Sequence, residues 1–165
     1  MSMTALAFNA ALFTGEAIEV GLNEVHFVKF TEDNIRGIGT QYLNLNGSTV
    51  IVMLSSSAAI VANVPHLPYT GLYPCAEMRN AYAKLEQLLF LYRQSYDVLG
   101  PEQTCLVVGL GGGGPNCPTS YYLNYVDCRL AQNNIGSDRV LYGVSPYNVT
   151  VFVDARHGSP RIHSI

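Results

Sequence analysis

Charged residues are scarce in this chain of 165 residues. Asp, Glu, Lys and Arg make up 13% of it, about half of what a typical soluble domain carries. The 9 basic and 12 acidic side chains give a formal net charge of −3, and Lys and Arg cluster nowhere along the sequence. Without a basic surface, neither nucleic-acid binding nor docking on an anionic membrane is expected. The 48% of apolar residues excludes intrinsic disorder and suggests that part of the surface is covered by a partner.

Long hydrophobic runs are also missing. No stretch approaches the 18 or more apolar residues of a membrane span, and the longest dense run, Val50 to Leu54, fits a buried strand. Residues 1–15 are mildly apolar, but no Lys or Arg precedes Lys29, whereas a secretory signal begins with a basic segment. We therefore expect no membrane segment, and we interpret residues 1–15 as a loose arm or a short pairing segment.

The four cysteines show neither a CxxC pair nor the spacing of a disulfide framework. This pattern favours reduced thiols and a cytoplasmic location. Cys105 and Cys128 fall inside a predicted strand and a predicted helix and are expected in the core. Cys75 precedes a long predicted helix, whose N-terminus favours a reactive thiolate. The alternative is that Cys75 is a small apolar side chain beside Pro74. Cys117 has no evident base near it in sequence.

The hydrophobic pattern predicts a β-rich first part, two helices separated by a strand, and a β-rich end. Three serines at 55–57 join two strands as a hairpin, and the polar stretch 31–39 is interpreted as a loop. Because the order is not a repeating βαβ, we expect one α/β domain over residues 1–165, with packed mixed β-layers flanked by two helices on one side. The predicted strands are 18–22, 25–30, 49–54, 59–64, 104–110, 139–144, 148–153 and 161–165, and the predicted helices are 75–97 and 120–133.

A glycine run, 109–114, lies between a predicted strand and a predicted helix. Dinucleotide-binding folds hold the pyrophosphate at such a place. However, two prolines separate the run from the helix, and no acidic residue closes a second strand about twenty residues later, as ribose binding would require. We favour a turn that permits a close backbone approach and expect no cofactor, keeping Gly111, Gly112 and Gly113 as binding candidates.

The four histidines, His26, His66, His157 and His163, lie far apart in the sequence. None has a Cys, Asp or Glu partner at the spacing of metal ligands, so no metal site is predicted. His26 alternates with apolar neighbours in a strand and is expected on its exposed face. His157 lies in a turn between two strands and is expected in solvent.

One pair of sequence features is typical of a catalytic site. The turn Gly47-Ser48-Thr49 opens one predicted strand, and His66 follows the strand paired with it. A hairpin places these two ends together. A hydroxyl beside a histidine base is the minimum arrangement for acyl transfer. We therefore select Thr49, Ser48 and His66 as candidate catalytic residues, with Gly47 as a binding residue.

The same segment resembles CheD, the chemotaxis-receptor glutamine deamidase, and its cysteine-hydrolase relatives such as the catalytic domain of cytotoxic necrotizing factor. In that family a Gly-Ser-Cys turn opens an apolar strand, and a histidine follows just ahead of a Leu-Pro pair. This chain has Gly47-Ser48-Thr49-Val-Ile-Val-Met-Leu, and His66-Leu67-Pro68 begins seventeen residues after Thr49. The other similar segments are 20–24, 75–99, 107–114 and 148–158.

The resemblance implies a CheD-like fold, but two family positions differ. Thr49 replaces the nucleophilic cysteine, and Leu43 replaces a threonine of the family, so that only His66 is retained. If the chain is an enzyme, we expect an amidohydrolase or deamidase using a Thr49/His66 cleft on an amide or small molecule, or acid/base chemistry by His66 alone. The alternative is an inactive CheD-like binding or structural protein that self-associates as a homodimer.

Overall fold

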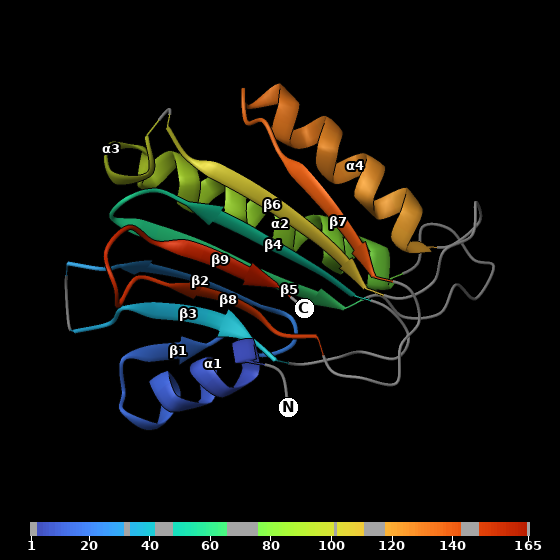
Figure 1. Cartoon of the computed structure of the whole chain (residues 1–165). Coiled ribbons are helices and arrows are strands. Elements are labelled where there is room, and N and C mark those ends of the chain that lie inside the picture. The colour runs from blue at the N-terminus through green and yellow to red at the C-terminus, as the bar shows by residue number, and fades with distance from the viewer. Residues whose placement is uncertain are drawn as a thin grey trace.

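The computed structural model describes residues 3–31, 34–41, 48–65, 76–100, 102–110, 118–142 and 149–164. Figure 1 shows two β-sheets between helices. The helices are α1 (Met3–Phe13), α2 (Ala76–Gln94), α3 (Tyr96–Leu99) and α4 (Pro118–Gln132). The strands are β1 (Ala17–Glu19), β2 (Glu24–Lys29), β3 (Gly37–Thr40), β4 (Ser48–Leu54), β5 (Ala58–Pro65), β6 (Thr104–Leu110), β7 (Asp138–Tyr142), β8 (Val151–Asp154) and β9 (Arg161–Ser164).

Both sheets are mixed. The five-stranded sheet has the order β2-β5-β4-β6-β7, and the four-stranded sheet has the order β1-β3-β8-β9. Within them, β6–β7 and β1–β3 are parallel pairs and the other pairs are antiparallel. The predicted mixed α/β class is confirmed.

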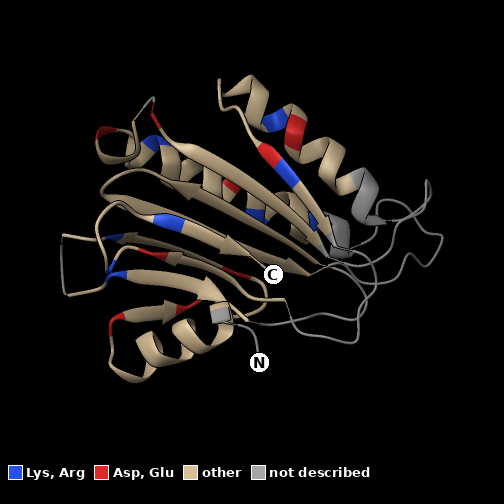
Figure 2. Cartoon of the chain, in the orientation of Figure 1, with Lys and Arg blue, Asp and Glu red and all other residues tan. Residues whose placement is uncertain are grey.

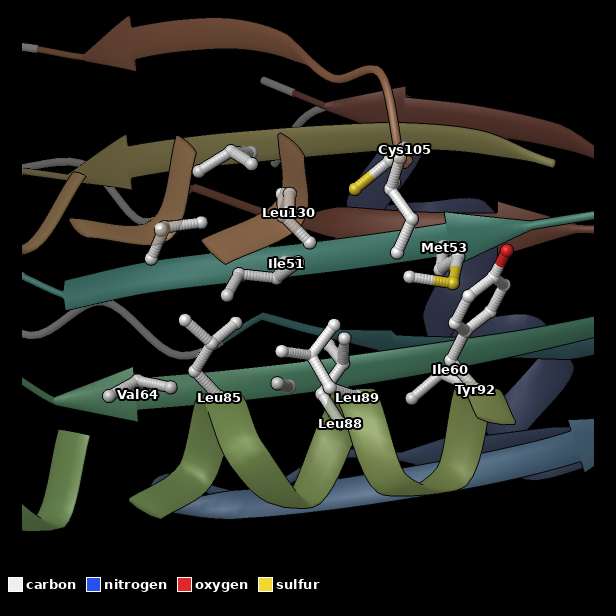
Figure 3. Packing of buried hydrophobic residues seen from close by; sticks show 14 of the residues in the cluster. Ile51, Met53, Ile60, Val64, Leu85, Leu88, Leu89, Tyr92, Cys105 and Leu130 are labelled. Carbon is white, nitrogen blue, oxygen red and sulfur yellow. The ribbon is translucent and has the colours of Figure 1, made fainter. Parts of the chain in front are cut away.

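The layers run helix, sheet, sheet, helix. Along β4, Ile51 and Met53 pack under α2 and α4, whereas Val50 and Val52 face the other sheet. Successive side chains of a strand point to opposite faces, so β4 is buried on both sides. Figure 3 shows the helix side, with Ile51 and Met53 near the leucines of α2. Burial on both faces explains why this strand is continuously apolar instead of alternating.

Helices α2 and α4 cover the outer face of the five-stranded sheet, as predicted. On α2, Leu85, Leu88, Leu89 and Tyr92 are buried, and so are the apolar residues predicted on one face of α4. Tyr96, which continues this spacing in the predicted helix 75–97, instead lies in α3 and is 49% exposed. Tyr122 joins the two helices by donating a hydrogen bond from its hydroxyl to the Ala81 carbonyl over 2.9 Å. Glu86 pairs with Arg129 across the same interface at 2.8 Å. The prediction for Cys128 is wrong, because this residue lies on the exposed side of α4, while Cys105 is buried.

Helix α1 corrects the expectation for residues 1–15. Residues 3–13 form neither a loose arm nor a pairing segment but a helix on the outer face of the four-stranded sheet. Its Phe8 is fully buried, with its ring centroid 4.9 Å from that of Phe152. On the other side of the helix, Leu6 and Phe13 are exposed. A helix that is apolar on nearly all sides has no distinct polar face, so its sequence carries no helical period.

Strand β3 corrects the interpretation of 31–39 as a loop, because its first three residues belong to that stretch. Two of its four residues, Gly37 and Gly39, are glycine, a residue that strands disfavour. A Cβ on Gly37 would come within 2.8 Å of the Phe152 ring. The glycine therefore permits a close approach that no other residue allows.

Candidate functional site

The hairpin of β4 and β5 positions the first candidate residues. Its turn is closed by a hydrogen bond from the Ser55 amide to the Ala58 carbonyl at 2.9 Å. In the resulting register, Ser48 pairs with Pro65 and Thr49 pairs with Val64. The start of β4 and the end of β5 therefore lie side by side, as the sequence predicted.

The same end of the five-stranded sheet receives the end of β6. Leu110 pairs with Ser48 on the side away from β5, and Tyr142 of β7 pairs with Leu110. At this end the described chain stops at Pro65, Leu110 and Tyr142 and resumes at Ser48. We call this place the Ser48 end of the sandwich.

Most of the predicted site residues lie outside the described residues. They are Gly47, His66, Cys75, Gly111, Gly112 and Gly113. Gly47 precedes Ser48 in sequence, His66 follows Pro65, and Gly111 follows Leu110, so each is a chain neighbour of a residue at the Ser48 end. Cys75 precedes Ala76, the first residue of α2. The described structure places only Ser48 and Thr49.

These two residues do not share one site. Adjacent strand residues point to opposite faces, so Thr49 points to the side of Ile51 and Met53, under the helices, whereas Ser48 points to the other sheet. Both side chains are fully buried. Substrate must reach a hydroxyl before it can act as a nucleophile, and neither hydroxyl meets this condition.

Apolar side chains cover the sheet beside Thr49. Its partner on β6 is Gly109, which lies on the same helix-facing side. A Cβ on Gly109 would come within 2.9 Å of Leu141 and 3.0 Å of Leu123. These two leucines therefore occupy the space over Gly109, the strand partner of Thr49.

The sequence did not single out the polar group on the opposite face of the sheet. Asn63 of β5 is fully buried and donates a hydrogen bond from Nδ2 to Oγ1 of Thr40 at 2.9 Å, joining the two sheets. The Oδ1 atom of Asn63 and the Oγ atom of Ser48 are buried without a hydrogen-bond partner. One signal could have revealed this group, because Asn63 is the single amide in the otherwise apolar strand AAIVANVP.

Lys, Arg, Asp and Glu residues are sparse over the described strands and helices (Figure 2). On β2, His26 and Glu24 pair at 2.7 Å, with 39% and 50% of their side chains exposed, and the hydrogen bond from His26 lowers the pKa of the Glu24 carboxyl. His157 is exposed, as expected. Burial raises the pKa of the Cys105 thiol to about 12, so this cysteine stays protonated.

Neither metal ligands nor a membrane-spanning element stand out in the described part of the chain. No three His, Cys, Asp or Glu side chains gather there as a metal site would require. No helix in it has both the length and the apolar character needed to cross a bilayer.

No protein-family model matches this chain, and no curated protein matches it either. The resemblance to CheD therefore rests on the quoted residues and on the order of the elements.

Proposed function

We propose that this chain is a CheD-like domain that binds a protein or small-molecule partner and does not use Thr49 as a nucleophile. The burial of Thr49 under the helices carries the proposal. An intact thiol hydrolase needs a reactive side chain at this position, and a buried threonine supplies neither thiolate nor access. The proposal of a CheD-like fold is supported by four elements that follow one another along the chain. They are the hairpin of β4 and β5, helix α2, strand β6 ahead of the glycine run, and the hairpin of β8 and β9.

The Ser48 end of the sandwich is the proposed place of binding. Gly47, His66 and Gly111 are chain neighbours of residues at this one end. Binding residues commonly lie on connecting segments that a rigid scaffold holds in place. Here the scaffold is the central part of the five-stranded sheet, which is buried on both faces.

Substitution of Thr49 by cysteine tests the burial argument. In the Thr49→Cys protein, we expect the new thiol to react with iodoacetamide as slowly as buried Cys105 and far more slowly than exposed Cys128. Site-resolved mass spectrometry compares the three thiols in one molecule, so the two native cysteines serve as controls. Rapid alkylation at position 49, at the rate of Cys128, would contradict the proposal.

A second candidate function is amide hydrolysis or proton transfer that depends on His66. The specific observation in its favour is the Ser48–Pro65 pair, which brings the residue before His66 to the start of β4. Imidazole titrates near neutral pH and can move a proton without a nucleophile beside it. Release of ammonia from glutamine-containing peptides, abolished by His66→Ala, would establish this function. If Thr49→Val also abolished the release, Thr49 would be the nucleophile.

We also propose that the protein forms a homodimer through α1. Leu6 and Phe13 are 50% and 93% exposed, and Ala10 between them is exposed as well. Spacings of four and three residues place the three side chains on one face of the helix. Sedimentation should show a dimer that dissociates on Phe13→Ser, with Thr14→Ser as the control. A wild-type protein that sediments as a single chain at high concentration would refute the dimer.

A further inference from the structure

The space between the two sheets is apolar along most of its length and polar at one end. Valines of β4 and β8 fill most of it, together with Ile38 of β3. At the Ser48 end, three polar residues, Ser48, Asn63 and Thr40, also face inward, beside Val50 and Val151, the strand partners of Asn63 and Thr40. Each is at most 1% exposed. The group of three polar residues, which we call the inner polar site, lies on the opposite face of β4 from Thr49.

The register places Ser48 and Asn63 close together. Asn63 pairs directly with Val50, and Ser48 lies two residues before Val50 on the same face of β4. Such diagonal neighbours on antiparallel strands are about 7–8 Å apart. One small polar group lying between them can therefore reach both side chains.

The hydrogen-bonding capacity of the inner polar site is only partly used. Asn63 donates a hydrogen bond from Nδ2 to Thr40. Its Oδ1 atom accepts no hydrogen bond, and the Ser48 hydroxyl has no hydrogen-bond partner. Burying a polar atom unpaired is costly, so native proteins pair nearly all of them. Two unpaired atoms on diagonally neighbouring residues of the same inner face point to a bound polar group.

We infer that the inner polar site binds a small neutral molecule through a hydroxyl or amide group. Asn63 Oδ1 can only accept, so the ligand must donate an N–H or O–H to it. The Ser48 hydroxyl can donate in return to an oxygen of the ligand. A neutral ligand fits better than an ion, because the inward-facing residues that the structure describes around the site are apolar or uncharged and would not replace the hydration of an ion. The inner polar site lies at the same Ser48 end as the proposed place of binding, but this inference rests on Ser48 and Asn63 and not on Gly47, His66 or Gly111.

Two pairs of probes test the inference with the full-length chain. Ethylene glycol and acetamide carry the required donors. Their counterparts, 1,2-dimethoxyethane and acetate, lack the donor, and acetate is also charged. We expect the first pair alone to raise the unfolding temperature in a saturable way, by roughly 3–5 °C at ten times the dissociation constant. The side-chain amide signals of Asn63 in NMR spectra should shift with the same saturation curve.

Substitutions locate the effect. Ser48→Ala should weaken binding about tenfold, the loss expected for one hydrogen bond, and Asn63→Ala should abolish it. Ser57→Ala is the matched control, since Ser57 lies in the turn at the far end of the same hairpin. If Asn63→Ala does not fold, Ser48→Ala decides the question alone. A wild type that shows no saturable shift with either donor probe, or a shift that Ser48→Ala leaves unchanged, would overturn the inference. If an ordered internal water were the sole occupant of the inner polar site, neither donor probe would give a saturable shift with the wild type.

Discussion

The docking of α1 gives the sharpest test of the fold. Phe8 is fully buried and packs on Phe152, whose ring lies on the outer face of the four-stranded sheet. Removing a buried phenylalanine ring costs about 3–5 kcal/mol in protein cores. Because α1 is a surface layer that can partly close the gap, we expect Phe8→Ala to cost about 3 kcal/mol of unfolding free energy.

Phe13→Ala provides a matched control on the same helix. Its side chain is 93% exposed in the single chain. At a protein concentration low enough for the proposed dimer to dissociate, the identical substitution should therefore change the unfolding free energy by no more than about 0.5 kcal/mol. Urea unfolding followed by circular dichroism measures both variants. For a chain of this size, the loss at Phe8 corresponds to a drop of about 6–12 °C in Tm.

Hydrogen exchange distinguishes a docked helix from a loose one. In the wild type, the amides of the second half of α1 should be protected, and in Phe8→Ala they should exchange much faster than those of β4. If Phe8→Ala cost less than about 1 kcal/mol and the wild-type α1 amides exchanged freely, residues 3–13 would be the loose arm that the sequence suggested. Helix α1 would then not be a docked layer on the four-stranded sheet.

Two further substitutions test polar contacts. Burial pushes the pKa of Asp154 upward, but hydrogen bonds from Arg156, each 3.0 Å long, outweigh it and leave the pKa below its usual value. Because the pKa of Asp154 is lower in the folded protein than in the unfolded chain, its ionised carboxylate stabilises the fold at pH values above the unfolded-state pKa. This stabilisation is lost as the pH falls through the folded-state pKa. Asp154→Asn should therefore cost about 1–2 kcal/mol at pH 7, and urea unfolding at pH 3 should show a smaller difference. Tyr122→Phe removes the hydrogen bond to the Ala81 carbonyl between α4 and α2. Urea unfolding should show a loss of about 0.5–1.5 kcal/mol, and an unchanged stability would mean that this bond is not formed.

The hairpin of β4 and β5 and the helices α2 and α4 were predictable because their apolar patterns are strong. The stripe that includes Leu85 and Leu88 repeats at helical spacing, and the three serines at 55–57 mark the turn of the hairpin. Helix α1 and strand β3 were not predictable for two different reasons. The helix is apolar on every side and so lacks a period, and the strand contains glycines that are typical of loops.

The candidate site was harder to predict because β4 is buried on both faces. Its residues do not alternate between polar and apolar, so the sequence gives no sign of which face each one joins. Ser48 and Thr49 were therefore grouped in one site, although the register separates them. The group of Ser48 and Asn63 depends on the pairing of β4 with β5, which no local pattern of either strand reveals.

At the Ser48 end, the helix side of β4 is covered by apolar side chains, whereas the side facing the other sheet carries the inner polar site. On the helix side, Leu123 and Leu141 cover the space beside Gly109 and Thr49, so a cysteine at position 49 alone should stay unreactive. Removing Leu123 should change this, and Thr49→Cys combined with Leu123→Ala should react with iodoacetamide faster than Thr49→Cys. Leu130→Ala is the control, since Leu130 is a buried leucine two turns further along α4 and its loss destabilises the same interface. Equal acceleration by both leucine substitutions would mean that global unfolding, and not local cover, limits access to position 49.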